Sequence, residues 1–448
     1  MVQRATSHMK HALPERAWPC PERLWIAGAV LMALYASFQF LWPTVGQPAE
    51  TLTAVLGLLA LLRYGTGLRN TAPLWLLLAA LVVQTLSWWL ILRDIPDYAA
   101  DNPRLDRLAK LFIFIAVAWW LGGSTRLTLT VWGLALVGFL LQALFGGGGW
   151  EEWQAGLQGQ RIEYGIRNPQ HGAMLFGVAL LGLVIFAGRF WQPGRWHLAR
   201  RGLWCAMTLL ALVGVLIGLT RAVWLGLLLA FAVAAFVVVY HRRRFARPAA
   251  GGLSPIRIGL MSLALACVLA LAGWAFQENL TQRIADEREV LVHMAERGLE
   301  DVPYTSIGIR INTWQAGVEW GLERPWVGWG SEARSLVIQE TPWLPPFVKQ
   351  HFGHLHNFLL EVWVAYGLFG VMLILGLAGW VGWATFVSWR GGVMPGDMAL
   401  FALTFFIYWA VVNQFESYNS FWTGVFVHNL IVGGLVTHYW RWWKEQRA

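Results

Sequence analysis

Charged residues are scarce in this sequence. Asp, Glu, Lys and Arg make up 13% of its 448 residues, against about 25% in ordinary soluble domains. Hydrophobic residues make up 57%, and many apolar runs reach the length of about 20 residues that a membrane-spanning helix needs. These features exclude a soluble globular protein and predict an all-α, polytopic membrane protein.

Cysteine and lysine are also rare. The three cysteines, Cys20, Cys205 and Cys267, form no disulfide, redox or metal-binding pattern. The chain has four lysines and no GxxxxGK phosphate-binding loop, which excludes ATP-driven machinery. The net charge of +9 is spread over short loops between apolar runs. We therefore expect no nucleic-acid partner and no cofactor, and membrane lipids as the surroundings.

Twelve membrane-spanning helices are predicted. The apolar run 207–240 would be about 50 Å long as one helix, too long for a hydrocarbon core of about 30 Å, and so predicts two helices with a tight turn near Thr220 and Arg221. The predicted spans are 24–42, 49–65, 73–93, 108–123, 126–147, 169–189, 201–219, 222–240, 256–276, 356–386, 397–413 and 420–440.

The distribution of basic residues predicts the orientation. With both termini in the cytoplasm, the cytoplasmic segments hold 20 of the 34 Lys and Arg residues, as the positive-inside rule requires. The basic segment 1–23 is interpreted as a cytoplasmic tail and not as a signal peptide. Segments 148–168 and 277–355 then form the main loops on the outer face.

The chain divides into three predicted regions. Residues 1–276 contain nine spans, residues 277–355 form a large outer loop, and residues 356–448 contain three spans and the C-terminal tail. Helical spacing within the loop predicts two amphipathic helices near the membrane surface, or simply covering the bundle. Their apolar faces are Leu280, Ile284, Leu291 and Met294, and Ile311, Trp314, Val318 and Leu322, the second helix ending at Pro325.

Four arginines on the predicted outer face are candidate ligands for an anionic substrate. Arg221 lies at the tip of a hairpin with almost no other polar residues, where a cation is costly unless it is paired or hydrated. Arg161 and Arg167 flank a compact polar stretch, and Arg310 opens an amphipathic helix in an otherwise acidic loop. Each arginine is alternatively an interfacial anchor or an ordinary ion-pair partner.

A histidine cluster lies before the tenth predicted span. His354 and His356 are separated by one residue, and Asn357 follows. Histidine titrates near neutral pH and suits acid–base chemistry. A metal site is the alternative, but no acidic residue adjoins the cluster and no cysteine is near, so we expect no metal. Arginines can stabilise a pyrophosphate leaving group without a divalent ion.

Two motifs resemble those of bacterial O-antigen ligases. Arg221-Ala-Val-Trp-Leu225 fits RxxxL, and His356-Asn357 followed after nine residues by Gly367-Leu-Phe-Gly370 fits H[NSQ]x9GxxG. The stretch from Arg310 to Gly330 is similar to a block of the wider ligase and polymerase superfamily. Both motifs fall on the outer face of the predicted topology.

The resemblance implies a GT-C-like fold in the bacterial inner membrane with a periplasmic active site. It implies a metal-independent, inverting glycosyltransferase that moves O-antigen polysaccharide from undecaprenyl pyrophosphate to lipid A–core oligosaccharide. Arg221 would bind pyrophosphate and His356 would act at the acceptor. Arg310, Arg161, Arg167, His354 and Asn357 would help to bind substrate, with His354 as an alternative base.

Other functions remain open at this point. An O-antigen polymerase or a protein O-oligosaccharyltransferase would use the same donor with another acceptor. A transporter or flippase of lipid-linked sugar belongs to another class, and would favour charges near the middle of the bilayer. The polar clusters of this sequence lie instead at the outer ends of the predicted spans, which favours an enzyme.

Overall fold

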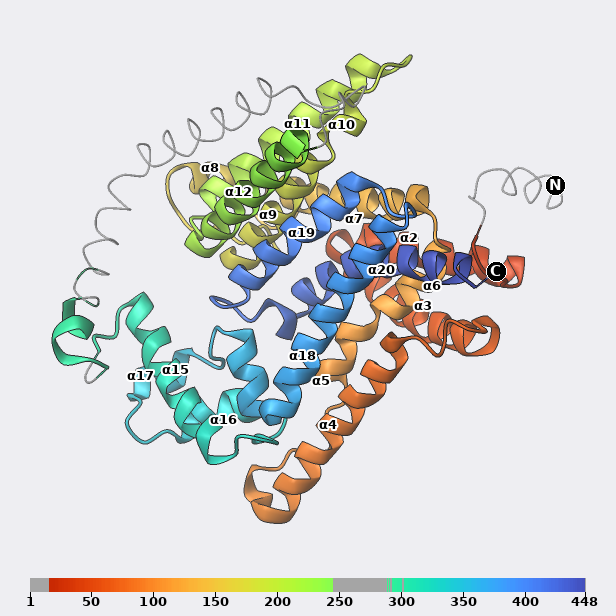
Figure 1. Ribbon diagram of the computed structural model, residues 1–448. Helices are drawn as coiled ribbons and strands as arrows, with labels where there is room; N and C mark the ends of the chain where they lie inside the picture. Colours follow the sequence, from red (N-terminus) through yellow and green to blue (C-terminus); the bar gives the residue numbers. More distant parts are fainter. Residues whose placement is uncertain (1–15, 245–287, 289, 291, 300–301, 448) are drawn as a thin grey trace.

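The computed structural model describes residues 16–244, 288, 290, 292–299 and 302–447. All regular elements in these ranges are helices, and they contain no β-strand. Figure 1 shows their arrangement. The α-helices are α2 (Glu22–Leu41), α3 (Pro43–Tyr64), α4 (Ala72–Asp94), α5 (Asp106–Ala109), α6 (Phe114–Leu121), α7 (Thr125–Phe145), α8 (Gly149–Leu157), α9 (Pro169–Ile185), α10 (Ala187–Phe190), α11 (His197–Ile217), α12 (Arg221–Arg244), α15 (Ser306–Glu323), α16 (Ala333–Glu340), α17 (Pro346–His351), α18 (Phe358–Arg390), α19 (Gly396–Val412) and α20 (Trp422–Glu445), with short 3-10 helices η1 (Pro96–Tyr98), η2 (Lys110–Phe112) and η3 (Tyr418–Ser420).

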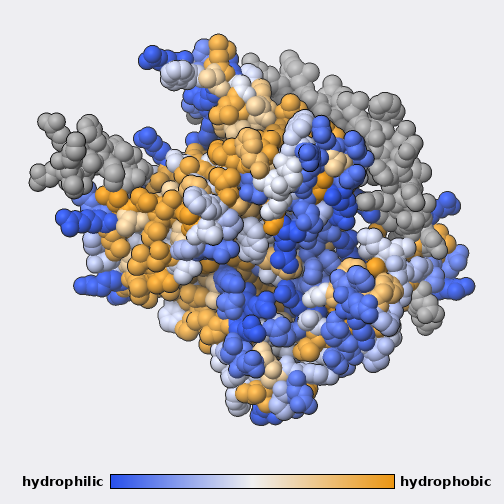
Figure 2. All heavy atoms as spheres, turned by 180° about the vertical axis from the view of Figure 1, so that it is seen from behind, coloured by the Kyte–Doolittle hydropathy of each residue, from blue (hydrophilic) through white to orange (hydrophobic). Residues whose placement is uncertain are grey.

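The prediction of an all-helical, polytopic membrane protein is confirmed. Seven helices of the described part are long and apolar enough to cross a membrane: α2, α3, α4, α7, α11, α12 up to Tyr240, and α18. Helices α9 and α19 are apolar but shorter. Figure 2 shows hydrophobic residues gathered over a broad area of one face, with hydrophilic residues gathered below it. The predicted span 256–276 lies outside the described residues.

The region predicted as one span at 108–123 is broken instead into α5, η2 and α6. At the start of α6, the backbone N–H of Phe114 donates to the side-chain oxygen of Asn429 on α20 across 2.8 Å. A side chain of a neighbouring helix thus satisfies a backbone group that a continuous helix would bond internally. All eight residues of α6 are buried.

Helix α20 is the most enclosed long helix of the bundle. Its residues from Thr423 to Trp440 are buried, and it packs against α6, α7 and α18. Polar side chains on it find partners in neighbouring segments: Nε2 of His428 contacts the Leu111 carbonyl at 3.0 Å. Because it is shielded from lipid by its neighbours, α20 can carry polar residues that a lipid-facing helix would not tolerate.

The expected break in the long apolar run 207–240 is present. Helix α11 ends at Ile217 and α12 begins at Arg221. Between them Leu219 adopts a φ of 44°, a left-handed conformation that reverses the chain direction. The sequence therefore predicted this helical hairpin correctly.

Helices α15, α16 and α17 lie together beside the N-terminal part of α18 (Figure 1). Helix α15 is capped by the Thr305 hydroxyl, which accepts from the Gly308 N–H at 3.2 Å, and it ends before Pro325 as predicted. It packs against α18 through glycine, since a Cβ at Gly321 would lie 3.0 Å from the ring of Trp363. Leu322, on the predicted apolar face, is 65% exposed. The first predicted helix of this loop lies largely outside the described residues.

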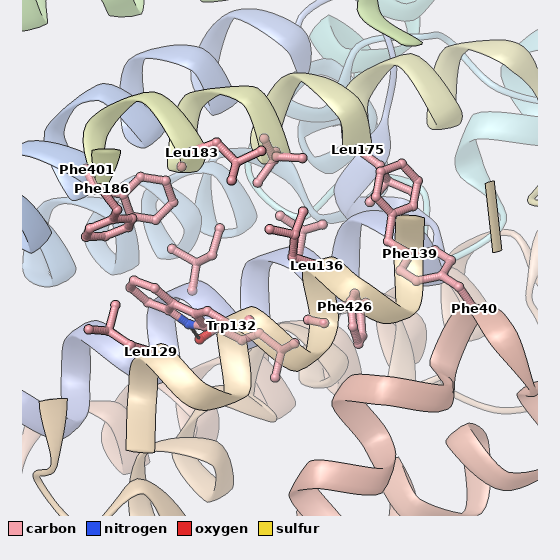
Figure 3. A pocket seen from close by; sticks show the side chains of 18 of the residues that line it. Phe40, Leu129, Trp132, Leu136, Phe139, Leu175, Leu183, Phe186, Phe401 and Phe426 are labelled. Carbon is pink, nitrogen blue, oxygen red and sulfur yellow. Dashed lines mark hydrogen bonds between the residues drawn. The ribbon is translucent and has the colours of Figure 1, made fainter. Parts of the chain in front are cut away.

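An apolar pocket opens among α7, α9, α19 and α20 (Figure 3). Its volume is about 260 Å³. The labelled side chains Trp132, Phe139 and Phe426 point into it from α7 and α20. Its lining is almost entirely hydrophobic and includes Arg189.

Candidate active site

Two loops meet at one end of the bundle. Residues 352–357 precede α18, and residues 413–421 connect α19 to α20. The backbone N–H of Phe358 donates to the Asn413 carbonyl across 2.9 Å, which ties the loops together. The loop 352–357 carries both candidate histidines.

His356 is paired with a buried carboxylate. Its Nδ1 lies 2.8 Å from Oε2 of Glu416, and the two side chains are 14% and 2% exposed. His356 has a φ of 53°, a backbone conformation that is costly for a residue other than glycine and that is often found at functional sites. The fold therefore holds this ring in a fixed position against Glu416.

The electrostatic environment assigns the protonation states of this pair. Burial alone would raise the pKa of Glu416, but the hydrogen bond from His356 and the neighbouring histidines lower it to about 2. Burial lowers the pKa of His356, and the hydrogen bond to Glu416 opposes this in part. Near neutral pH, Glu416 is then a carboxylate that only accepts, so Nδ1 of neutral His356 is the donor. The lone pair of His356 lies on Nε2.

His354 lies between two carboxylates. Its Nδ1 is 3.6 Å from Oε1 of Glu416 and 3.6 Å from Oε1 of Glu361. Its ring centroid is 3.9 Å from that of His356. Two imidazoles and two carboxylates therefore share one compact space.

Glu361 is almost fully buried and has several hydrogen-bond donors. Oε1 accepts from the Ser417 hydroxyl at 2.7 Å and from the Leu355 N–H at 3.1 Å. Oε2 accepts from the Ser420 hydroxyl at 2.9 Å, and Arg334 lies 3.9 Å away. Such a well-satisfied carboxylate fixes the loop 413–421 relative to α18.

Arginines surround the ring of Phe421, next to the histidines. The guanidinium carbon of Arg167 lies 3.9 Å from the ring centroid, and that of Arg334 lies 5.4 Å from it. The ring of His354 is 5.2 Å from the same centroid. The structure thus brings Arg167 to the histidine cluster, and adds Arg334.

Arg310 acts electrostatically on the same groups. Burial lowers the pKa of its guanidinium, while the negative charge of Glu416 opposes the shift. The pKa of Tyr418 is raised well above its usual value by burial and by Glu416, and the charges of Arg310 and Arg161 oppose that shift. Arg310 and the exposed Arg161 therefore both lie within electrostatic range of the loop 413–421.

His171 is a further buried histidine at the site. Its Nδ1 bonds to the Thr423 hydroxyl, and its ring packs edge-on against Tyr418 and Phe421. Its Nε2 is buried and has no hydrogen-bond partner among the described residues. The Asn168 side chain caps α9 by accepting from the His171 N–H at 3.1 Å, which fixes this residue at the helix start.

Arg221 lies at the same end of the bundle. It is the first residue of α12, and Gly218 in the preceding turn packs directly against Ala173 of α9. Ala173 is two residues beyond His171. The fold therefore places the turn that carries Arg221 next to the helix start that carries His171.

A comparison with known families matches residues 206–375 to the model described as O-antigen ligase. This match supports membership of the O-antigen ligase family over that region of the chain. The matched region includes Arg221, Arg310, His356 and Glu361, whereas Glu416 lies outside it. No curated protein matches the chain.

The fold gives a physical reason for the ligase motif H[NSQ]x9GxxG. Helix α18 is interrupted at Gly367, which has a φ of 63°, and a Cβ there would lie 2.1 Å from the backbone of Trp326. The interruption leaves the Val364 and Ala365 carbonyls to accept from Trp329 and Gly330 at 2.8 and 2.9 Å. The two sequence blocks that resemble the ligases therefore form one interlocked unit.

Asn357 has a structural role in the same motif. Its side-chain oxygen accepts from the Leu360 N–H at 3.1 Å and caps α18. Asn and Ser are among the preferred residues at this position, which accounts for their presence in the motif. The predicted role of Asn357 in substrate binding stays a prediction.

Neither carboxylate of the site was predicted from the sequence. A metal was not expected because no acidic residue adjoins the histidines in the chain, but folding brings Glu361 and Glu416 to within 3.6 Å of His354. A signal for Glu361 was present, since it is an acidic residue inside the apolar run Phe358–Arg390, and such residues are usually functional. Glu416 lies between two spans, where acidic residues are ordinary, so no feature of the sequence predicted a functional role for it.

Proposed function

We propose that this family member is an O-antigen ligase acting on the periplasmic side of the bacterial inner membrane. It would transfer O-antigen polysaccharide from undecaprenyl pyrophosphate to a sugar hydroxyl of lipid A–core, by a metal-independent, inverting reaction. The hydrogen bond between His356 and Glu416 is the observation that carries this proposal, because it leaves the Nε2 lone pair of His356 available as a base.

The reaction follows from these groups. Nε2 of His356 takes the proton of the acceptor hydroxyl while the acceptor oxygen bonds to the anomeric carbon of the donor sugar. The bond between that carbon and the pyrophosphate oxygen breaks, and undecaprenyl pyrophosphate leaves with both bonding electrons. A single displacement inverts the configuration at the anomeric carbon.

Glu416 acts as a positioning residue in this scheme. Its carboxylate accepts from Nδ1–H of His356 and stabilises the imidazolium that forms as the proton is transferred. The carboxylate of a catalytic Ser-His-Asp triad does the same for its histidine. Because it is 2% exposed, the interaction is little weakened by water.

The arginines would bind the pyrophosphate. Arg221, Arg167 and Arg310 come from three different elements and lie at the same end of the bundle as the histidines. Guanidinium groups bind phosphate oxygens in pairs and stabilise charge that develops as the bond breaks. The apolar pocket of about 260 Å³ among α7, α9, α19 and α20 (Figure 3) suits a hydrocarbon chain.

The test is a transfer assay with the purified full-length protein in EDTA. We expect lipid A–core to be extended by polysaccharide from the undecaprenyl-linked donor, without added metal. A polymerase would instead lengthen the donor glycan when no lipid A–core is present, and a flippase would move lipid across liposomes without forming a glycosidic bond. Activity that requires Mg²⁺ or Mn²⁺ would contradict the metal-independent reaction.

A further inference from the structure

We propose that His354, His356 and Glu416 form a Zn²⁺ site, and that the bound ion switches the transferase off. Metal binding goes beyond the proposed function and does not depend on it, whereas the inhibition rests on His356 being the base. The metal-free protein is the active form in this account.

The three side chains are already arranged as ligands. One nitrogen from each histidine and one oxygen of Glu416 all lie within 4.8 Å of one another. Ligands of a tetrahedral zinc ion are about 3.3 Å apart, given metal–ligand bonds of about 2.0–2.1 Å. Nδ1 of His354 is 3.6 Å and Nδ1 of His356 is 2.8 Å from the Glu416 carboxylate, so small side-chain movements suffice.

His354 lies where two buried carboxylates could share a cation with it. Its Nδ1 faces Oε1 of both Glu361 and Glu416 at 3.6 Å, too far for an N–H···O hydrogen bond. Nδ1 instead accepts from the backbone N–H of His356 at 3.3 Å, a contact that it would exchange for a bond to the ion. Both carboxylates are nearly buried, at 4% and 2% exposure, where a positive charge between them and the imidazole would be favourable.

The chemistry of the ligands selects the type of ion. Imidazole nitrogen suits Zn²⁺ and similar transition metals, while Mg²⁺ and Ca²⁺ prefer oxygen. Two histidines and one glutamate are a common zinc ligand set that leaves a fourth position for water. His354 and His356 are 19% and 14% exposed, which gives an ion access from the aqueous side.

Occupation of this site removes the base without removing any residue. A neutral imidazole has one ring proton, and in His356 it lies on Nδ1, facing Glu416. When Zn²⁺ binds Nδ1, the proton moves to Nε2. Nε2 then donates and can no longer accept the proton of the acceptor hydroxyl. The ion also takes the Glu416 oxygen that held the ring, so the metal-bound protein cannot deprotonate its acceptor.

The experiment uses the full-length protein, with a purification tag that contains no histidine, treated with EDTA and then dialysed. ZnCl₂ is titrated calorimetrically, and CoCl₂ is added separately to record the visible absorption of the ion. We expect saturable Zn²⁺ binding that is at least 10-fold weaker in His354→Ala and Glu416→Gln. His351→Ala is the matched control, because this exposed histidine bonds to the nearby Phe347 carbonyl at 2.8 Å and lies outside the three ligands. This variant should bind Zn²⁺ as the wild type does.

The outcomes separate the two proposals. Equal Zn²⁺ affinity in wild type and His354→Ala, or a Co²⁺ spectrum that this substitution leaves unchanged, would overturn the site. His354 is partly exposed, so we expect His354→Ala to fold. The test therefore gives a result even if Glu416→Gln does not fold. Zinc binding by a protein that transfers no glycan would support the site and refute the proposed function. Full transfer activity in saturating Zn²⁺, reached without EDTA, would refute the switch.

Discussion

Nδ1 of His356 lies 2.8 Å from Oε2 of Glu416, which is 60 positions later in the chain. The histidine belongs to the loop before α18, and the glutamate belongs to the loop between α19 and α20. The contact joins the segment that resembles the ligase motif to a segment that contains no recognised motif. It also fixes which ring nitrogen can act as a base.

Replacing Glu416 tests its positioning role. Glu416→Gln keeps the shape of the side chain but removes the charge that stabilises the imidazolium. We expect kcat to fall about 100-fold, in the range of a general acid–base contribution, with little change in the affinity for the donor. Steady-state kinetics on the purified variant measure both quantities. An unchanged kcat would show that Glu416 does not act through His356.

The pH profile reports the state of His356. Burial lowers the pKa of His356 below its ordinary value of 6.5, and Glu416 opposes this only in part. The neutral ring is the active form, so the rate should fall as pH falls through a value below 6.5. In Glu416→Gln the opposing effect is lost, and this acid limb should move to still lower pH. A wild-type acid limb above pH 7 would contradict the assignment.

Gly367 should be essential for the fold around the site. In Gly367→Ala the new Cβ would require a left-handed φ of 63° and would lie 2.1 Å from the Trp326 backbone. We expect a loss of about 2–5 kcal/mol of unfolding free energy, from backbone strain and overpacking. The matched control is Gly376→Ala in the same helix, where nothing lies within 4 Å. Thermal unfolding in detergent should show a lower midpoint for Gly367→Ala alone.

Labelling of single cysteines tests the orientation. Glu340 lies in α16 beside the site and Gln192 follows α10, and both side chains are exposed. In a variant without native cysteines, a cysteine at 340 should react with a membrane-impermeant thiol reagent in cells with a permeabilised outer membrane. A cysteine at 192 should react only after the inner membrane is opened. The reverse pattern would overturn the periplasmic placement of the site.

The sequence predicted the helices well where their ends are set by local chemistry. The turn before Arg221 and the stop at Pro325 depend on neighbouring residues and could be predicted from the sequence. The region 108–123 was mispredicted because the Asn429 side chain satisfies the Phe114 N–H. That contact comes from a helix more than 300 residues away, and no local pattern reports it.

The same distinction holds for the candidate site. His356 and Arg221 belong to motifs with fixed spacing, which a sequence displays directly. The pairing of His356 with Glu416, and the position of His354 between Glu361 and Glu416, arise only when α18, α19 and α20 pack together. Arg334 likewise gains its place near Phe421 from tertiary packing.

In the proposed reaction His356 activates the acceptor and Arg221 binds the donor pyrophosphate. Arg221→Lys should be impaired too, since it keeps the charge and loses paired hydrogen bonding. His351→Ala should behave as the wild type. Wild-type transfer by this variant would show that loss of a nearby exposed histidine does not by itself reduce the transfer rate.

The most direct test measures donor affinity and transfer rate together, on purified His356→Ala and Arg221→Ala. We expect His356→Ala to lose transfer by at least about 100-fold while binding undecaprenyl-pyrophosphate glycan nearly as the wild type does. Arg221→Ala should bind the donor more weakly and also transfer about 100-fold more slowly. Equal loss of donor affinity in both variants would place the histidine in the phosphate site and contradict the account.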